Sequence, residues 1–159
     1  MNCDNPKIKR WCEETLRWVC AAVPTRIVIS IFCGHRAMTA RFGPPRKGRV
    51  LYGCFRWRRV GRERQCEIGI NTAQARTKKK VQRIFLHELL HALREADKDH
   101  RRVLDKFLEM FRDSQIAGYI AADIRTQYAE ECWDEEIAVE TLCFFILHAQ
   151  DWKPEDIFI

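Results

Sequence analysis

The sequence lacks the features that place a protein in or across a membrane. Its longest apolar run is residues 142–147, far short of the roughly 20 apolar residues that a membrane-spanning helix needs. Residues 1–6 are polar, so the apolar stretch of a signal peptide is missing there as well. We therefore expect a soluble, cytoplasmic protein without a membrane partner.

Paired cysteine motifs are also absent. The chain has eight cysteines, and no two of them stand in a C-x-x-C arrangement: Cys3, Cys12, Cys20, Cys33, Cys54, Cys66, Cys132 and Cys143. This scatter argues against a structural zinc site built from cysteines. Without a secretory signal, we expect reduced thiols that pack as small hydrophobic side chains.

The chain contains no internal repeat, no low-complexity tract and no linker long enough to separate two domains. Its 159 residues, 47% of them hydrophobic, are sufficient to bury one sizeable core. We therefore expect residues 1–159 to form a single domain. The sequence leaves the oligomeric state open.

Hydrophobic periodicity predicts a helix at the N-terminus and then a small sheet. Residues 6–22 have apolar side chains at helical spacing, and Pro24 ends this pattern. Strands are predicted at residues 26–32, 37–42, 50–57 and 65–71, the second from the alternation of side chains along it. These elements indicate a mixed sheet of about four strands in hairpin-like connection.

All later elements are predicted to be helical. Apolar side chains recur at helical spacing in residues 77–96, 99–112, 115–128 and 131–149. Together with the sheet, these helices predict an α+β fold. The first of the four carries the motif on which the functional interpretation depends.

That motif is His87-Glu88-Leu89-Leu90-His91. Residues four apart on a helix lie one turn above one another, so both imidazoles point the same way and can hold one zinc ion at about 2.0 to 2.1 Å. Glu88 is offset around the helix, where it can accept a proton from water on the metal. This HExxH pattern predicts a zinc-dependent hydrolase with Glu88 as its general base.

The residues around the motif support a buried helix. They are apolar on both sides, namely Ile84, Phe85 and Leu86 before it and Leu89, Leu90, Ala92 and Leu93 within and after it. Burying two histidines and a carboxylate without partners costs free energy, which a bound metal removes. This favours a metal site over two unrelated histidines. Of the other histidines, His35 is interpreted as a turn residue and His148 as a partner of a helix C-terminus.

The order of these elements resembles the zincin metallopeptidases. A leading helix, a sheet whose last strand contains Ile68-Gly69-Ile70-Asn71 and a helix with HELLH are similar to the small intracellular members of the ImmA/IrrE and SprT-like kind. The similarity covers residues 6–149. It implies Zn²⁺ on His87 and His91, Glu88 as general base and a protein or peptide substrate. It also places the last strand, residues 66–71, at the rim of the cleft.

The third zinc ligand is open among several residues. A gluzincin-like arrangement takes a glutamate from a later helix, and Glu136 fits best because the residues around it, Val139 and Cys143, are small and apolar. Glu140 then stands where it can hydrogen-bond a ligand histidine. Glu135 and Glu140 are the alternative ligands on the same helix.

Two further alternatives follow the motif directly. An SprT-like protein would use a histidine beyond the helix, for which His100 is the candidate, although Arg101-Arg102 replace the Gly-Pro that commonly follows it. A metzincin-like site would use Asp97, but Arg94 stands where that pattern has glycine. For an oxyanion donor, Tyr119, Tyr128 and Arg125 are available, and spacing prefers none of them.

Charge suggests a second class of partner. The chain has a formal net charge of +6, and its basic residues concentrate in segments 44–49, 56–64 and 76–80, the second of which includes Trp57. These segments could lie along the phosphates of a nucleic acid. The alternative function is therefore a catalytically silent zincin-fold scaffold that binds nucleic acid through basic loops. The intact Glu88 argues against it, because a scaffold needs no general base.

Overall fold

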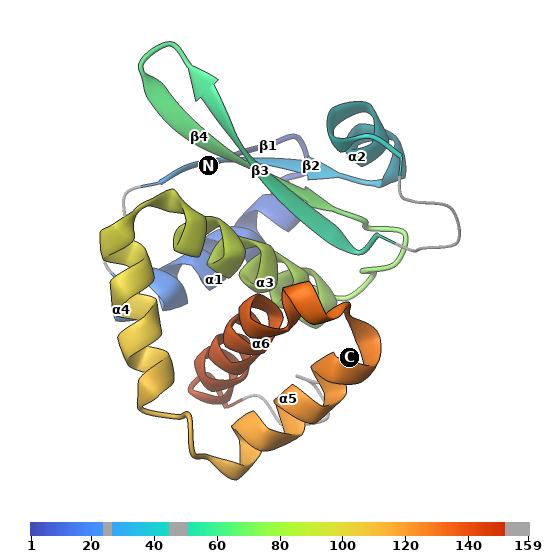
Figure 1. Ribbon diagram of the computed structural model, residues 1–159. Helices are drawn as coiled ribbons and strands as arrows, with labels where there is room; N and C mark the ends of the chain where they lie inside the picture. The colour runs from blue at the N-terminus through green and yellow to red at the C-terminus, as the bar shows by residue number, and fades with distance from the viewer. Residues whose placement is uncertain (24–26, 45–50, 152–159) are drawn as a thin grey trace. The chain divides into compact units, whose positions relative to one another are not determined.

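A computed structural model of the chain describes residues 1–23, 27–44 and 51–151 (Figure 1). They form six α-helices, one short 3-10 helix and a four-stranded sheet, which confirms the predicted α+β class. Contacts divide the chain into two compact units, Met1–Ala92 and Leu93–Ile159. The single domain over residues 1–159 stays a prediction. None of the described helices is long and apolar enough to cross a membrane.

The first unit begins with helix α1, Pro6–Ala22, where a helix was predicted. Its start is set by Asn5, whose side-chain oxygen accepts hydrogen bonds from the backbone N–H groups of Lys7 and Ile8, both at 3.1 Å. Pro6 suits the first helical position because its missing N–H would have no helical partner there.

The sheet is mixed, as predicted. Its strands are β1 (Asn2–Cys3), β2 (Val28–Cys33), β3 (Gly53–Val60) and β4 (Glu63–Ile70), in the spatial order β1-β2-β4-β3. β1, β2 and β4 are parallel, and β3 pairs with β4 in antiparallel fashion. Only β3 and β4 are therefore joined as a hairpin, and the expected hairpin-like connection of all the strands is wrong.

The predicted strand at residues 37–42 is also wrong, because this segment lies in helix α2, His35–Phe42. Met38 and Phe42 are four residues apart, a spacing that fits both the alternation of a strand and one turn of a helix. His35, interpreted as a turn residue, is the first residue of α2. The fourth strand of the sheet is instead β1, which was not predicted. Arg26 and Val50, at the starts of two predicted strands, lie outside the described residues.

The rim position expected for residues 66–71 is contradicted by the topology. β4 lies between β2 and β3, so it has a neighbour on each side, and β3 is the strand at this edge of the sheet. The hairpin carries β3 to the outer side of β4, because consecutive antiparallel strands pair directly. Any function of an edge strand here therefore belongs to β3.

The sheet has two different faces. One is apolar and buried, with Ile29, Cys66, Ile68 and Ile70 at 0% exposure. Helix α1 and helix α3 (Lys78–Ala96) lie on this side, whereas α2 lies on the other (Figure 1). On the α2 side, a Cβ atom added to Gly69 of β4 would stand 2.8 Å from Sγ of Cys54, 2.9 Å from the ring of Phe42 and 3.1 Å from Cγ of Met38.

A buried carboxylate anchors the α2 face. Glu67 of β4 is 2% exposed and accepts hydrogen bonds from Nε of Arg41 at 2.8 Å and Nε of Arg56 at 2.7 Å. Burial raises the pKa of Glu67, but the hydrogen bonds from these two arginines together outweigh it, so the pKa lies below its ordinary value. The carboxylate thereby joins α2, β3 and β4.

The second unit is helical. After the end of α3 come α4 (Lys98–Glu109), α5 (Gln115–Gln127), a 3-10 turn (Glu130–Cys132) and α6 (Trp133–His148), which confirms the three predicted helices with small shifts at their ends. α6 packs against α4 and α5. Between Ala138 and Leu147 it is buried on most of its circumference, as expected for a segment that is apolar on nearly every face.

Replacing Glu67 by Gln is expected to lower the free energy of unfolding at about pH 7 by roughly 1–3 kcal/mol, because the charge-assisted hydrogen bonds are lost. The folded-state pKa is below the unfolded value, so this stabilisation is present above the unfolded pKa. It disappears as the pH falls through the folded-state pKa. Urea denaturation of both proteins at about pH 7 and about pH 3 measures the difference. An equal difference at both pH values would contradict the assignment.

Candidate metal centre

Helix α3 carries the HELLH motif on a buried framework. Seven of its apolar side chains are 0% exposed: Val81, Phe85, Leu86, Leu89, Leu90, Ala92 and Leu93. Gln82, 1% exposed, donates a hydrogen bond of 3.3 Å to the backbone oxygen of Trp11 and so fastens α3 to α1. The predicted buried helix is confirmed, and it presents the motif on a rigid element.

The two histidines are arranged as a pair of metal ligands. Their Nε2 atoms lie 3.2 Å apart, and their ring centroids are 4.7 Å apart. Two nitrogens bound to one tetrahedral zinc ion at about 2.0 to 2.1 Å would be separated by about 3.3 to 3.4 Å. The observed separation therefore leaves both Nε2 atoms within reach of a single ion.

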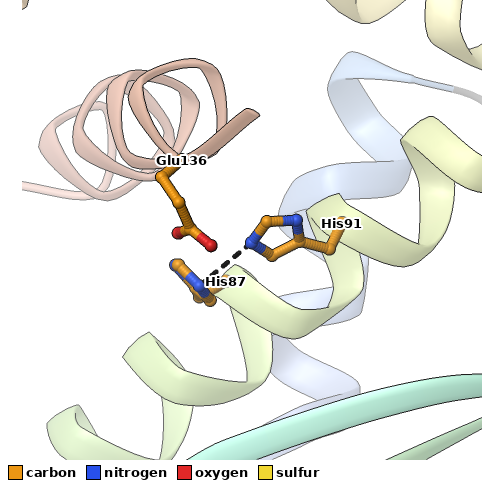
Figure 2. A group of neighbouring side chains, drawn as sticks. All are labelled: His87, His91 and Glu136. Carbon is orange, nitrogen blue, oxygen red and sulfur yellow. Dashed lines mark hydrogen bonds between the residues drawn. The ribbon is translucent and has the colours of Figure 1, made fainter. Parts of the chain in front are cut away.

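Glu136 is the candidate for a third donor. Among the described residues, His87, His91 and Glu136 form a group that could hold a metal ion, with one ligand atom from each and all these atoms within 4.8 Å of one another (Figure 2). These are the three residues that the sequence put forward as metal ligands.

The other candidates for a third ligand have charged partners of their own. Glu135 accepts hydrogen bonds from Nε of Arg94 at 3.2 and 3.3 Å. Asp97 caps helix α4 by accepting from the backbone N–H of His100 at 2.8 Å, and its other oxygen lies 2.7 Å from Nδ1 of the same histidine. These bonds to His100 lower the pKa of Asp97. Of these candidates, Glu136 is the one that belongs to the three-residue group found among the described residues.

Arg94 stands where the metzincin pattern has glycine, and α3 does not end there. Its side chain is only 8% exposed and pairs with Asp105 of α4 as well as with Glu135 of α6. The helix continues to Ala96. Because Glu135 is adjacent to Glu136, Arg94 also restrains the first turn of α6, which carries the proposed third donor.

Glu88 lies against β3 at a point where the strand has no side chain. It is 9% exposed. A Cβ atom added to Gly53 would stand 2.6 Å from Oε1 of Glu88 and 2.6 Å from Cγ2 of Ile84, which is too close for either contact. Glycine at position 53 therefore provides the space for the Glu88 carboxylate.

The neighbouring residues of β3 extend this contact. Burial, and next the negative charge of Glu88, raise the pKa of the Cys54 thiol to about 12, so it stays protonated at neutral pH. The ring of Phe55 is stacked against the imidazole of His91, with centroids 5.9 Å apart and an interplanar angle of 9°. β3 thus helps to orient one histidine and to accommodate the glutamate.

The contributions of Gly53 and Phe55 were missed in the sequence. A signal was present, because a glycine inside a predicted strand often marks the close approach of another group to the backbone. Which group approaches depends on how the strand and α3 pack. That packing cannot be read from the strand alone.

Compared with known proteins, the chain matches no family model, no curated protein and no solved structure. The functional argument therefore depends on the chemistry of these side chains.

Gly53→Ala and Gly69→Ala form a matched pair that tests the position of Glu88. Each added Cβ overpacks one face of the sheet, so both variants should lower the free energy of unfolding by about 1–3 kcal/mol. Only at position 53 does the new atom meet Glu88. Adding Glu88→Ala should therefore restore at least about 0.5 kcal/mol to Gly53→Ala and nothing to Gly69→Ala.

Urea denaturation of the single and double variants gives the two coupling energies. The same coupling to Glu88 in both backgrounds, or none in either, would contradict the placement of the carboxylate beside Gly53.

Proposed function

We propose that this protein is a zinc-dependent peptide hydrolase in which His87, His91 and Glu136 hold the ion and Glu88 is the general base. The observation that carries the proposal is the 3.2 Å separation of the two Nε2 atoms together with the carboxylate of the same three-residue group. Catalytic zinc sites commonly have three protein ligands of this kind, two histidines and a glutamate, and leave a fourth position for water.

In the proposed reaction, the zinc ion activates water and the carbonyl group, and Glu88 transfers the proton. When bound, a zinc ion lowers the pKa of water toward neutrality and polarises a carbonyl oxygen. Glu88 accepts the proton that the attacking water loses and later delivers it to the nitrogen of the leaving amine. Cleavage of the carbon–nitrogen bond then gives one new carboxylate and one new amine.

The surroundings of Glu88 support its role as a base. Its carboxylate is largely withdrawn from solvent, and Gly53 leaves room for it on β3. A protein that used this fold only as a scaffold would gain nothing from a carboxylate beside two metal-binding histidines. This arrangement favours the hydrolase over the silent scaffold.

The resemblance to zincins points to the same function. In those enzymes a strand at the rim of the cleft borders the HExxH helix, and an extended peptide can pair with it. Here β3 is the edge strand, and it contacts Glu88 through Gly53 and His91 through Phe55. Cytoplasmic peptide or protein substrates are the proposed targets.

Glu88→Gln is expected to reduce the cleavage of fluorescein-labelled casein by about 10²- to 10⁴-fold, because the amide cannot accept the proton from water. The variant should keep the zinc affinity of the wild type, since Glu88 is not a ligand. Casein hydrolysis and zinc binding are measured on the same preparations. Equal cleavage by the two proteins would show that the activity does not arise from this site.

Glu136→Gln is expected to weaken zinc binding by more than about 100-fold, since one of three ligands is lost. Asp134→Asn is the matched control, because it removes an exposed carboxylate from the same first turn of α6. Glu135→Gln and His100→Ala test the alternative ligands. Competition with a chelating dye measures each affinity. A large loss of zinc affinity in His100→Ala, with no loss in Glu136→Gln, would identify His100 as the third ligand.

A further inference from the structure

The β3–β4 hairpin extends beyond the body of the sheet as a two-stranded ribbon. β2 pairs with β4 only from Gln65 onward, whereas β3 and β4 remain paired up to Val60 and Glu63 (Figure 1). A tight turn at Gly61, whose φ of 62° suits glycine, closes the ribbon. Residues 58–64, here called the hairpin tip, are all exposed to solvent.

The hairpin tip is strongly basic. It contains four arginines, Arg58, Arg59, Arg62 and Arg64, against the single carboxylate of Glu63. Arg59 and Arg64 stand directly opposite each other in the ladder. Like charges in that position destabilise an antiparallel pair. An anion between the two guanidinium groups would reduce this repulsion.

Cations lie on both faces of the ribbon. Successive residues of a strand point to opposite sides, so Arg58 lies on the face of Glu67 and Arg59 on the other. On the second face, the guanidinium of Arg64 lies 4.6 Å from the centre of the Trp57 ring. The side chains of both faces are thus held on a regular, two-sided element.

At the base of the ribbon, around Glu67, positive charges outnumber negative ones. Glu67 is the carboxylate for three arginines: it accepts hydrogen bonds from Arg41 and Arg56 and lies 3.7 Å from Arg58. One negative charge cannot neutralise three guanidinium groups. The α2 face of the ribbon therefore remains positive below the tip as well.

The basic segments 44–49 and 76–80 give less support for an anion-binding site than the hairpin tip does. Residues 45–50 lie outside the described residues. In the segment 76–80, Lys78 makes an ion pair of 2.8 Å with Glu14 of α1. The hairpin tip is described in full, and its arginines outnumber its carboxylates by four to one.

The two-sided distribution of charge indicates the kind of partner. A flat anionic surface would be met by cations on one face of a ribbon, whereas a groove between two phosphate backbones meets both faces. The major groove of B-DNA, about 12 Å wide, admits a two-stranded β-ribbon, but the deep and narrow major groove of duplex RNA does not. Contacts to phosphates carry no sequence information, so binding would be independent of sequence.

We propose that the hairpin tip inserts into the major groove of duplex DNA, where its arginines contact phosphates of both strands. Four phosphate contacts give a slope of about −3 to −4 for log K against log salt concentration. This interaction is separate from the metal centre and does not require Glu88 or a bound ion.

The test is fluorescence anisotropy of a labelled DNA duplex of about 20 base pairs, roughly two helical turns, between about 50 and 200 mM salt. Arg59→Gln/Arg62→Gln should weaken binding by roughly 10-fold and make the slope shallower by about 1.8. Arg102→Gln/Lys106→Gln on α4 removes the same charge from another exposed surface and should change neither. Circular dichroism confirms that each variant is folded.

Three outcomes would overturn the proposal. The first is a failure of the expected binding pattern, either as no binding by the wild type or as the same loss in the hairpin and α4 variants. The second is tighter binding of duplex RNA than of DNA, which contradicts insertion into a wide groove. The third is competition by polyglutamate as effective as that by unlabelled DNA, which would identify an acidic polypeptide as the partner. Glu88→Gln should bind DNA like the wild type, so failure here is distinct from failure of the hydrolase.

Discussion

Helix α3 buries apolar side chains on most of its surface. The same helix also carries the imidazoles of His87 and His91 and the carboxylate of Glu88. Placing such polar groups in a largely apolar setting is costly unless each has a partner. The spacing of His87 and His91 by one helical turn lets a single ion satisfy both rings, and their Nε2 atoms stand at a separation that fits this use. The proposed function follows from that one requirement.

Strand β3 accommodates the polar side chains of α3. At its beginning, Gly53 makes space for Glu88 and Phe55 stacks on His91, while at its far end the strand enters the basic hairpin. The two proposals therefore share one structural element but use different parts of it. Arg94 has a comparable supporting role, since its pairing with Glu135 restrains the turn that precedes Glu136.

Much of the fold could be predicted because the helices have strong periodicity. Helix α1 begins and ends where it was predicted, and α3 differs by one residue at its start. The segment at Met38 and Phe42 was mistaken for a strand because a spacing of four residues satisfies both periods. The short β1 has only two residues, too few for any periodic signal.

The candidate site was predictable to the extent that it is local. His87, Glu88 and His91 follow from one turn of helix, whereas the choice among Glu136, Glu135 and His100 depends on contacts that sequence spacing does not record. Those contacts include the bond from Arg94 to Glu135 and the pairing of Asp97 with His100. Gly53 and Phe55 were missed for the same reason, because their role depends on packing between distant segments.

The zinc content of the untagged, purified wild-type protein tests the central claim most directly. Elemental analysis should find about one zinc ion per chain, or uptake of one after incubation with Zn²⁺, and X-ray absorption should show two imidazole ligands with oxygen ligands completing the shell. A protein that contains no zinc and takes up none would contradict the proposed metal centre and, with it, the proposed hydrolase.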